Sequence, residues 1–430
     1  MKLETLPTDR AKRDEVDRLI AASQNTQAHD LLSELWRSNP GSAAAGFILS
    51  RWDKIVPLPT MSTARITIIR SFTVEPAVPL LRAAAAVNRI DLKVEVGDFN
   101  TYVQEMLDAN SQIYQSEPDI VFLAVQTRDV APDLWQDFAK LSVEQRQSAV
   151  ERVSSDYRNW IECFRRHSKA SLVIHGLEMP AWLNCGLLDE QTNEGQASAL
   201  RQINNNIRKH ATEYPGIYLL DYDALIARYG RYRWHDERKW LTMRMPIAAD
   251  CIIHLANEWL RFIHPLTGKV CKVLVTDLDN TLWGGVVGED GAHGIKLDGE
   301  YPGAGYRALQ RVMLDLYQRG ILLAIASKNN IEDAMEVLEK HPQMLLRPAH
   351  FAALRINWND KAQSLREIAA ELNIGIDALA FIDDNPVECK RIRSEMPEVT
   401  VIELPADSLG YERVLRACPI FERLSLSSED

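Results

Sequence analysis

An apolar run ends in two carboxylates in the stretch Lys272-Val-Leu-Val-Thr-Asp-Leu-Asp-Asn-Thr-Leu-Trp-Gly-Gly285. Residues 273–276 are apolar or β-branched, which predicts a strand buried on both faces. Asp277 and Asp279 follow where this strand should end, and open α/β sheets bind ligands at the carboxyl ends of their strands. Because two carboxylates this close repel each other, we expect a hard divalent cation, Mg²⁺, to accompany them. Taken alone, the same residues also fit a capped turn whose acids only begin a helix.

The chain has 430 residues, of which 46% are hydrophobic, and this predicts two or three domains with cores of their own. A net charge of −11 argues against nucleic acid or an anionic membrane as the main partner. We expect a cytoplasmic protein, because the sequence shows no apolar signal core and no apolar run of about 18 residues. The six cysteines form no CxxC pair and are expected to be reduced thiols.

Two α/β domains are predicted from the order of the elements. Residues 1–60 read as a helical extension, with Asn39-Pro-Gly ending its second helix, and residues 61–268 as a domain of alternating strands and helices. Residues 269–430 repeat this alternation. We therefore predict an α/β fold of two doubly wound parallel-sheet (Rossmann-like) domains, preceded by a short helical segment. The predicted strands cover residues 65–70, 92–96, 119–125, 170–175, 216–221, 272–276, 321–326, 350–354, 378–382 and 400–404.

Four pieces of the second domain suit phosphoryl transfer. Asp277 is the predicted nucleophile that takes the phosphoryl group, and Asp279 is the predicted general acid and base. Lys361 is the third predicted catalytic residue, because a cation offsets the charge of a transferring phosphoryl group. The predicted phosphate-binding residues are Thr281, Ser327, Lys328 and Asn329. Taken singly, Ser327 also reads as a helix-start residue and each lysine as solvated surface.

The motif Phe381-Ile-Asp-Asp-Asn-Pro places two more acids after an apolar strand. Asp383 is expected to complete the metal site, so that the predicted metal ligands are Asp277, Asp279 and Asp383. The same letters are also good turn chemistry.

The order of these residues resembles the haloacid dehalogenase-like superfamily over residues 270–410. Asp277-Leu-Asp-Asn-Thr-Leu-Trp-Gly-Gly, Ser327-Lys-Asn-Asn330, residues 350–361 and Phe381-Ile-Asp-Asp-Asn-Pro-Val-Glu388 resemble the FkbH-like family (subfamily IIIC type) of polyketide pathways. The resemblance implies an enzyme that dephosphorylates 1,3-bisphosphoglycerate or a related phosphorylated acid. It would then load the glyceryl unit onto the phosphopantetheine thiol of an acyl carrier protein.

One position departs from the pattern. Relatives carry Cys before the Ser of the second motif, whereas Ala326 stands here. Three routes remain open: another thiol, with Cys271 and Cys389 nearest in sequence, holds the acyl group; the group passes directly to the carrier; or the chain handles a different phosphorylated acid. Each cysteine also fits a small buried hydrophobic residue.

The glycine-rich segment between Thr281 and Gly320 is too short for a large cap domain, and we expect it to form a tight flap beside the aspartates or a plain turn-rich connection.

Residues 61–268 resemble SGNH hydrolases, with Ser71 after the first strand and Gly97-Asp-Phe-Asn100 after the second. Val125-Gln-Thr-Arg-Asp129 replaces the expected Gly-x-Asn-Asp, so a degenerate site is expected. His235 and His254 are the possible bases, and each also fits a structural histidine. Residues 228–244 gather basic and aromatic side chains, which suit either a dock for an acidic carrier protein or substrate phosphates, or a salt-bridged edge.

Two rival functions remain open. A Mg²⁺-dependent small-molecule phosphatase of the same superfamily would use the same residues without a carrier protein. A binding module that has lost catalysis is the other, although the intact acidic set argues against it.

Overall fold

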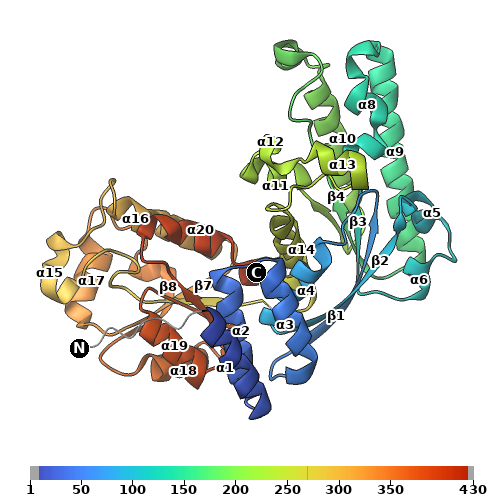
Figure 1. Cartoon of the computed structure of the whole chain (residues 1–430). Helices are drawn as coiled ribbons and strands as arrows, with labels where there is room; N and C mark the ends of the chain where they lie inside the picture. The colour runs from blue at the N-terminus through green and yellow to red at the C-terminus, as the bar shows by residue number, and fades with distance from the viewer. Residues whose placement is uncertain (1–8, 269, 425–430) are drawn as a thin grey trace. The chain divides into compact units, whose positions relative to one another are not determined.

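A computed structural model describes residues 9–268 and 270–424. The chain divides into two compact units, Met1–Thr267 and Gly268–Asp430 (Figure 1). Each unit is built around one five-stranded sheet in which every described pair of neighbouring strands is parallel. The predicted α/β fold class, with two parallel sheets and a helical N-terminal segment, is confirmed.

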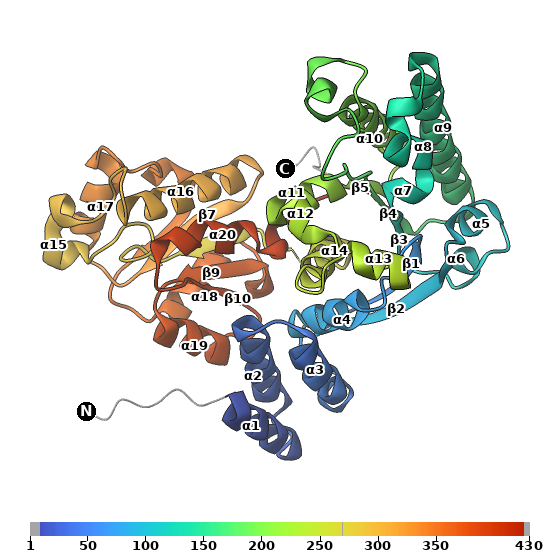
Figure 2. The same cartoon turned by 45° about the horizontal axis from the view of Figure 1, so that its top comes forward.

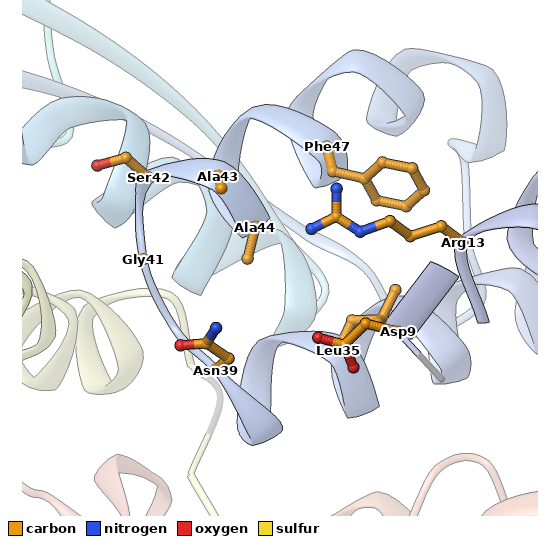
Figure 3. A pocket seen from close by; sticks show the side chains of 9 residues that line it. All are labelled: Asp9, Arg13, Leu35, Asn39, Gly41, Ser42, Ala43, Ala44 and Phe47. Atoms are coloured by element: carbon orange, nitrogen blue, oxygen red, sulfur yellow. The ribbon is translucent and has the colours of Figure 1, made fainter. Parts of the chain in front are cut away.

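Three helices open the first unit: α1 (Asp9–Ala21), α2 (Asn25–Ser38) and α3 (Ser42–Ile55). Their buried side chains, including Leu32, Ile48 and Trp52, share one core with the helix α4 (Ala77–Val87). A cavity of about 220 Å³ lies among these helices, lined by residues of α1, α2 and α3 (Figure 3). The guanidinium of Arg13 lies 4.8 Å from the centre of the Phe47 ring beside it.

The first sheet has the strand order β2-β1-β3-β4-β5. Alternate side chains of its strands face two different cores, one shared with α4 and α14 and the other with α9 and α10, so helices cover both faces (Figure 1). Its strands are β1 (Ser62–Arg70), β2 (Ile90–Phe99), β3 (Ile120–Ala124), β4 (Ser171–His175) and β5 (Ile217–Leu220). Its further helices are α5 (Tyr102–Leu107), α6 (Gln112–Gln115), α7 (Thr127–Val130), α8 (Pro132–Gln136), α9 (Val143–His167), α10 (Gln196–Thr212), α11 (Tyr222–Tyr229), α12 (Arg231–Trp234), α13 (Glu237–Met243) and α14 (Ile252–Leu266).

The second sheet has the strand order β10-β9-β6-β7-β8, with β6 at its centre. Figure 2 shows α16, α17 and α20 on one face and α18 and α19 on the other. Its strands are β6 (Val273–Thr276), β7 (Leu322–Ser327), β8 (Phe351–Ile356), β9 (Leu379–Asp383) and β10 (Thr400–Glu403). Its helices are α15 (Val287–Gly294), α16 (Gly303–Gln318), α17 (Ile331–Lys340), α18 (Lys361–Glu371), α19 (Pro386–Glu395) and α20 (Tyr411–Arg416).

All four residues of β6 are buried, as the apolar run predicted. Because β6 is central, the residues that follow it lie beside those that follow β7 and β9. The motifs that are far apart in sequence therefore meet at one edge of the sheet.

Candidate active site at the carboxyl edge of the second sheet

Lys361 lies between two carboxylates at this edge. It is the first residue of α18, its Nζ is 2.6 Å from Asp383 Oδ2 and 3.1 Å from Asp277 Oδ2, and only 4% of the residue is exposed. Burial lowers the pKa of Lys361, but the charges of Asp277 and Asp383 outweigh burial and raise that pKa above its ordinary value. The lysine is therefore a fixed cation held against the predicted nucleophile.

Three carboxylates crowd the same place. Oxygens of Asp277, Asp383 and Asp384 all lie within 4.8 Å of one another. Burial, together with the charge of Asp277, raises the pKa of Asp383 to about 7, although Lys361 opposes the shift. Burial also raises the pKa of Asp384, whose Oδ1 accepts a hydrogen bond of 3.1 Å from the hydroxyl of Thr281. One lysine thus does not neutralise the group.

One oxygen of the cluster, the buried Asp277 Oδ1, lacks a hydrogen-bond partner among the described residues. A buried oxygen without a partner is costly, and hard carboxylate oxygens are what Mg²⁺ prefers. The donor set therefore fits the expected cation.

The carboxylate of Asp279 is held apart from this group. Its Oδ1 accepts hydrogen bonds from the Trp283 indole N–H (2.8 Å) and the Val287 backbone N–H (3.1 Å). Its Oδ2 accepts one from the Asn329 amide (2.9 Å). Asp384 therefore joins Asp277 and Asp383 in the carboxylate cluster, whereas the side chain of Asp279 lies outside it. The sequence feature that could have indicated Asp384 as a member of the cluster is its position directly after Asp383.

The second motif lies where β7 ends. Ser327 and Asn329 are 4% and 5% exposed, and the Asn329 amide also lies 3.4 Å from Ser327 Oγ. Lys328 points elsewhere: its Nζ pairs with Glu388 Oε1 at 2.6 Å, at the start of α19. Sequence reasoning had not singled out Glu388 or Trp283 as partners of these residues, although both lie inside the quoted motifs.

The segment after Asp279 folds back in a tight connection. The backbone groups of Gly284 and Lys296 exchange two hydrogen bonds, of 2.7 and 2.9 Å. A Cβ at Gly284 would lie 2.7 Å from the Tyr306 ring, so glycine is required there. The helix α15 lies within this connection and begins at Val287.

The two cysteines nearest to the motifs are poor nucleophiles. Cys271 is 3% exposed and Cys389 is fully buried. Burial raises the pKa of each thiol to about 12. Because the thiolate is the reactive form, neither side chain is suited to hold an acyl group. Ala326, also fully buried, packs on the face of the sheet that α18 and α19 cover.

In the first unit, Ser71 follows β1 and is 1% exposed, and its Oγ accepts a hydrogen bond of 2.9 Å from the Gln126 backbone N–H. The ring of His235 contacts the backbone carbonyl of Arg231, and the ring of His254 stacks on Tyr229. These contacts of the two histidines do not involve the serine.

Most of the basic residues of the 228–244 segment pair with acids. Arg228 pairs with Glu258, Arg233 with Asp250, and Lys239 with Asp236, while Arg231 pairs with Asp223. These pairs favour the salt-bridged edge over a dock for acidic partners. Within the part of the chain that the structure describes, no helix is both long and apolar enough to cross a membrane.

The second unit thus combines a parallel α/β sheet with an acidic site at the carboxyl edge of that sheet. The family model of the FkbH N-terminal domain matches residues 77–264, so this part of the chain is similar to that family.

The N-terminal part of the protein BF1531 from Bacteroides fragilis, described as containing a phosphatase domain complexed with Mg, has a similar structure. It is 24% identical with a TM-score of 0.74, over 85% of this chain and 96% of that one. This likeness shows the fold.

Two further solved structures match about half of the chain. Axe2, an acetylxylan esterase from Geobacillus stearothermophilus, is 12% identical with a TM-score of 0.33, over 48% of this chain and 96% of that one. LAE5, an alpha/beta hydrolase from the metagenome of Lake Arreo, is 14% identical with a TM-score of 0.31, over the same shares. Scores this low support no conclusion. No curated protein matches the chain.

Proposed function

We propose that the second unit is a Mg²⁺-dependent phosphatase in which Asp277 accepts the phosphoryl group. The observation that carries this proposal is the position of Asp277, which lies 3.1 Å from the buried Lys361 and inside a group of three carboxylates. A nucleophile beside a fixed cation suits a reaction in which negative charge moves onto the attacked group.

The reaction would proceed in two steps. A carboxylate oxygen of Asp277 attacks phosphorus, the new O–P bond forms, and the O–P bond to the leaving oxygen breaks. Asp279 gives its proton to that oxygen. Asp279 then takes a proton from water, whose oxygen attacks phosphorus, and inorganic phosphate leaves as the Asp277 carboxylate is restored.

Asp277, Asp383 and Asp384 would hold the cation. When bound, Mg²⁺ supplies positive charge that offsets the charge of the phosphoryl group. The Mg in the similar BF1531 structure supports this choice of ion. Lys361 would keep the Asp277 and Asp383 carboxylates in place, to which its Nζ is paired, and Ser327 would bind a phosphate oxygen.

We further propose the substrate and the acceptor that the FkbH-like family implies. The match of residues 77–264 favours 1,3-bisphosphoglycerate as substrate and a phosphopantetheinylated acyl carrier protein as acceptor. The carrier's sulfur would attack the acyl carbon, form the thioester C–S bond and break the C–O bond to one phosphate. The other phosphate would be hydrolysed at Asp277. Burial of Cys271 and Cys389 favours direct transfer over a thioester on the enzyme.

The same proposal assigns the parts of the chain. Residues 1–60 form a helical extension, residues 61–268 an SGNH-like domain whose hydrolytic site is degenerate, and residues 269–430 the haloacid dehalogenase-like domain. The contacts of Ser71, His235 and His254 support the loss of a serine–histidine pair in the first of these domains.

The test incubates the full chain with 1,3-bisphosphoglycerate, Mg²⁺ and a phosphopantetheinylated carrier. We expect release of inorganic phosphate, and a glyceryl adduct on the carrier that is detected by intact mass. In the Asp277→Asn variant we expect no hydrolysis of the phosphate that wild type removes at Asp277. Phosphate without an adduct would favour the plain phosphatase. No phosphate above the Asp277→Asn variant, on this substrate or on other phosphorylated acids, would contradict both.

A further inference from the structure

The carboxylate of Asp279 accepts hydrogen bonds from residues of two separate motifs. Trp283 and Val287 donate to Oδ1 from the connection that follows β6, and Asn329 donates to Oδ2 from the loop that follows β7. Two donors on one oxygen and a third on the other fix both the position and the plane of a carboxylate. An aspartate side chain that rotates freely would not keep these three hydrogen bonds.

Trp283 is held in a fixed position from which its indole N–H can donate to Asp279. Its side chain is fully buried in the core of the second unit. The preceding carbonyl, of Leu282, accepts a hydrogen bond of 2.8 Å from the buried amide of Gln310. A buried indole N–H needs an acceptor, whereas a phenylalanine of similar size needs none. Trp283 uses the Asp279 carboxylate as its acceptor. A tryptophan at this position therefore orients Asp279 as well as filling the core.

Asn329 connects these hydrogen bonds to the phosphate end of the site. Its amide donates to Asp279 and also lies within 3.4 Å of the hydroxyl of Ser327. The exposed neighbour Asn330 is different, because its side chain pairs with Asp333 and Trp358. Only one of the two consecutive asparagines therefore reaches the acid and base.

We propose that Trp283 and Asn329 are positioning residues that hold Asp279 for proton transfer, apart from the three carboxylates of the metal cluster. This inference rests on the proposed phosphatase function. It replaces the predicted role of Asn329 as a phosphate ligand with a role on Asp279. Loss of either donor leaves the carboxylate with two of its three hydrogen bonds and lets it shift, and a displacement of about 1 Å is enough to cost about 10²-fold in rate.

The test uses the full chain with Mg²⁺ and p-nitrophenyl phosphate. This substrate has a leaving group that departs without a proton, so formation of the aspartyl phosphate is spared, while its hydrolysis still needs the base. For Trp283→Phe and Asn329→Ala we expect kcat to fall about 10- to 100-fold with KM within about 3-fold of wild type. A stoichiometric burst of p-nitrophenol and phosphorylated enzyme in acid-quenched intact mass should accompany the slow turnover.

Matched controls make the same chemical changes elsewhere. Asn330→Ala and Trp182→Phe remove an exposed amide and an exposed indole and are expected to behave as wild type. If Trp283→Phe does not fold, as judged by its thermal unfolding, Asn329→Ala carries the test alone.

Two results would overturn the proposal. A raised KM with unchanged kcat in Asn329→Ala would make Asn329 a phosphate ligand, and a slow variant without accumulated phosphoenzyme would mean that the acid and base is not displaced. Failure of the proposed function looks different, because wild type itself would then release no more p-nitrophenol than Asp277→Asn.

Discussion

The carboxyl edges of the two sheets use the same scaffold for different contents. Both sheets have five parallel strands, and a polar residue follows an inner strand of each: Ser71 follows β1 and Asp277 follows β6. At the first edge Ser71 is bonded to the Gln126 backbone, and Glu178 accepts hydrogen bonds from Thr127. At the second edge three carboxylates meet around Lys361. Topology brings strand ends together, but residue types decide whether the place binds a cation.

A cluster of three carboxylates distinguishes the second edge from the first. Among the described residues the structure brings together one group of three metal-binding side chains, and it lies in the second unit. Four predictions test this difference between the two edges.

The largest effect is expected from Asp277→Asn. Phosphatase turnover should fall by at least about 10³-fold, because the amide cannot accept the phosphoryl group, while the fold is kept. Phosphate release from p-nitrophenyl phosphate measures it. Asp315→Asn, which changes an aspartate that is half exposed, is the control and should remain active. Substantial activity in Asp277→Asn would remove the nucleophile assignment.

Lys361→Met should act on both activity and stability. It removes the cation between Asp277 and Asp383, so we expect kcat/KM to fall about 10²-fold. Unpaired buried carboxylates should also lower the free energy of unfolding of the metal-free protein by about 3–5 kcal/mol in urea denaturation. Lys340→Met, at a lysine whose side chain is 71% exposed, is the comparison. Equal stability of the two variants would contradict the ion-pair role of Lys361.

The metal-free protein should become less stable as pH rises from about 4 to about 7. The folded-state pKa of Asp383 is raised to about 7, so over this window the folded protein keeps a proton that the unfolded chain releases, and stability is lost. Thermal unfolding in EDTA measures the slope, and Asp383→Asn should flatten it. Saturating Mg²⁺ should raise Tm in wild type but far less in Asp383→Asn. A Tm that is unaffected by Mg²⁺ in wild type would argue against the metal site.

The smallest effect is expected at the first edge. Ser71→Ala leaves the Gln126 backbone N–H without its partner and should cost about 1–2 kcal/mol in the free energy of unfolding. Phosphatase activity should not change, since the serine lies outside the acidic site. Ser50→Ala, at an exposed serine, controls for the stability change. Loss of phosphatase activity in Ser71→Ala would show that the two edges depend on each other.

Local pattern predicted most of the fold. The expected strand at 272–276 is β6, because a continuous apolar run suits a central strand that is buried on both faces. Strand ends shifted by one to three residues, as at β1, which begins at Ser62 rather than at Arg65. Such ends depend on pairing with neighbours, which the pattern of one segment does not contain.

The site was less completely predictable. Asp277, Ser327 and Asp383 could be placed at one edge because each lies at or directly after a strand end, whereas Lys361 begins the helix that follows β8. The partners of Lys328 and Asp279 could not be predicted. Glu388 pairs with Lys328, and Trp283 donates to Asp279, because of the directions in which their side chains point.

The sequence by itself determined the order of the elements and the residue types at the strand ends, because hydrophobic periodicity and the acidic motifs are local properties. Only the tertiary structure decided which carboxylate joins the cluster and which is held apart. Asp384 lies with Asp277 and Asp383, whereas Asp279 is turned to Trp283 and Asn329. Spacing along the chain fixes where a backbone passes, but distances of a few ångströms between side chains follow from how the strands and loops pack.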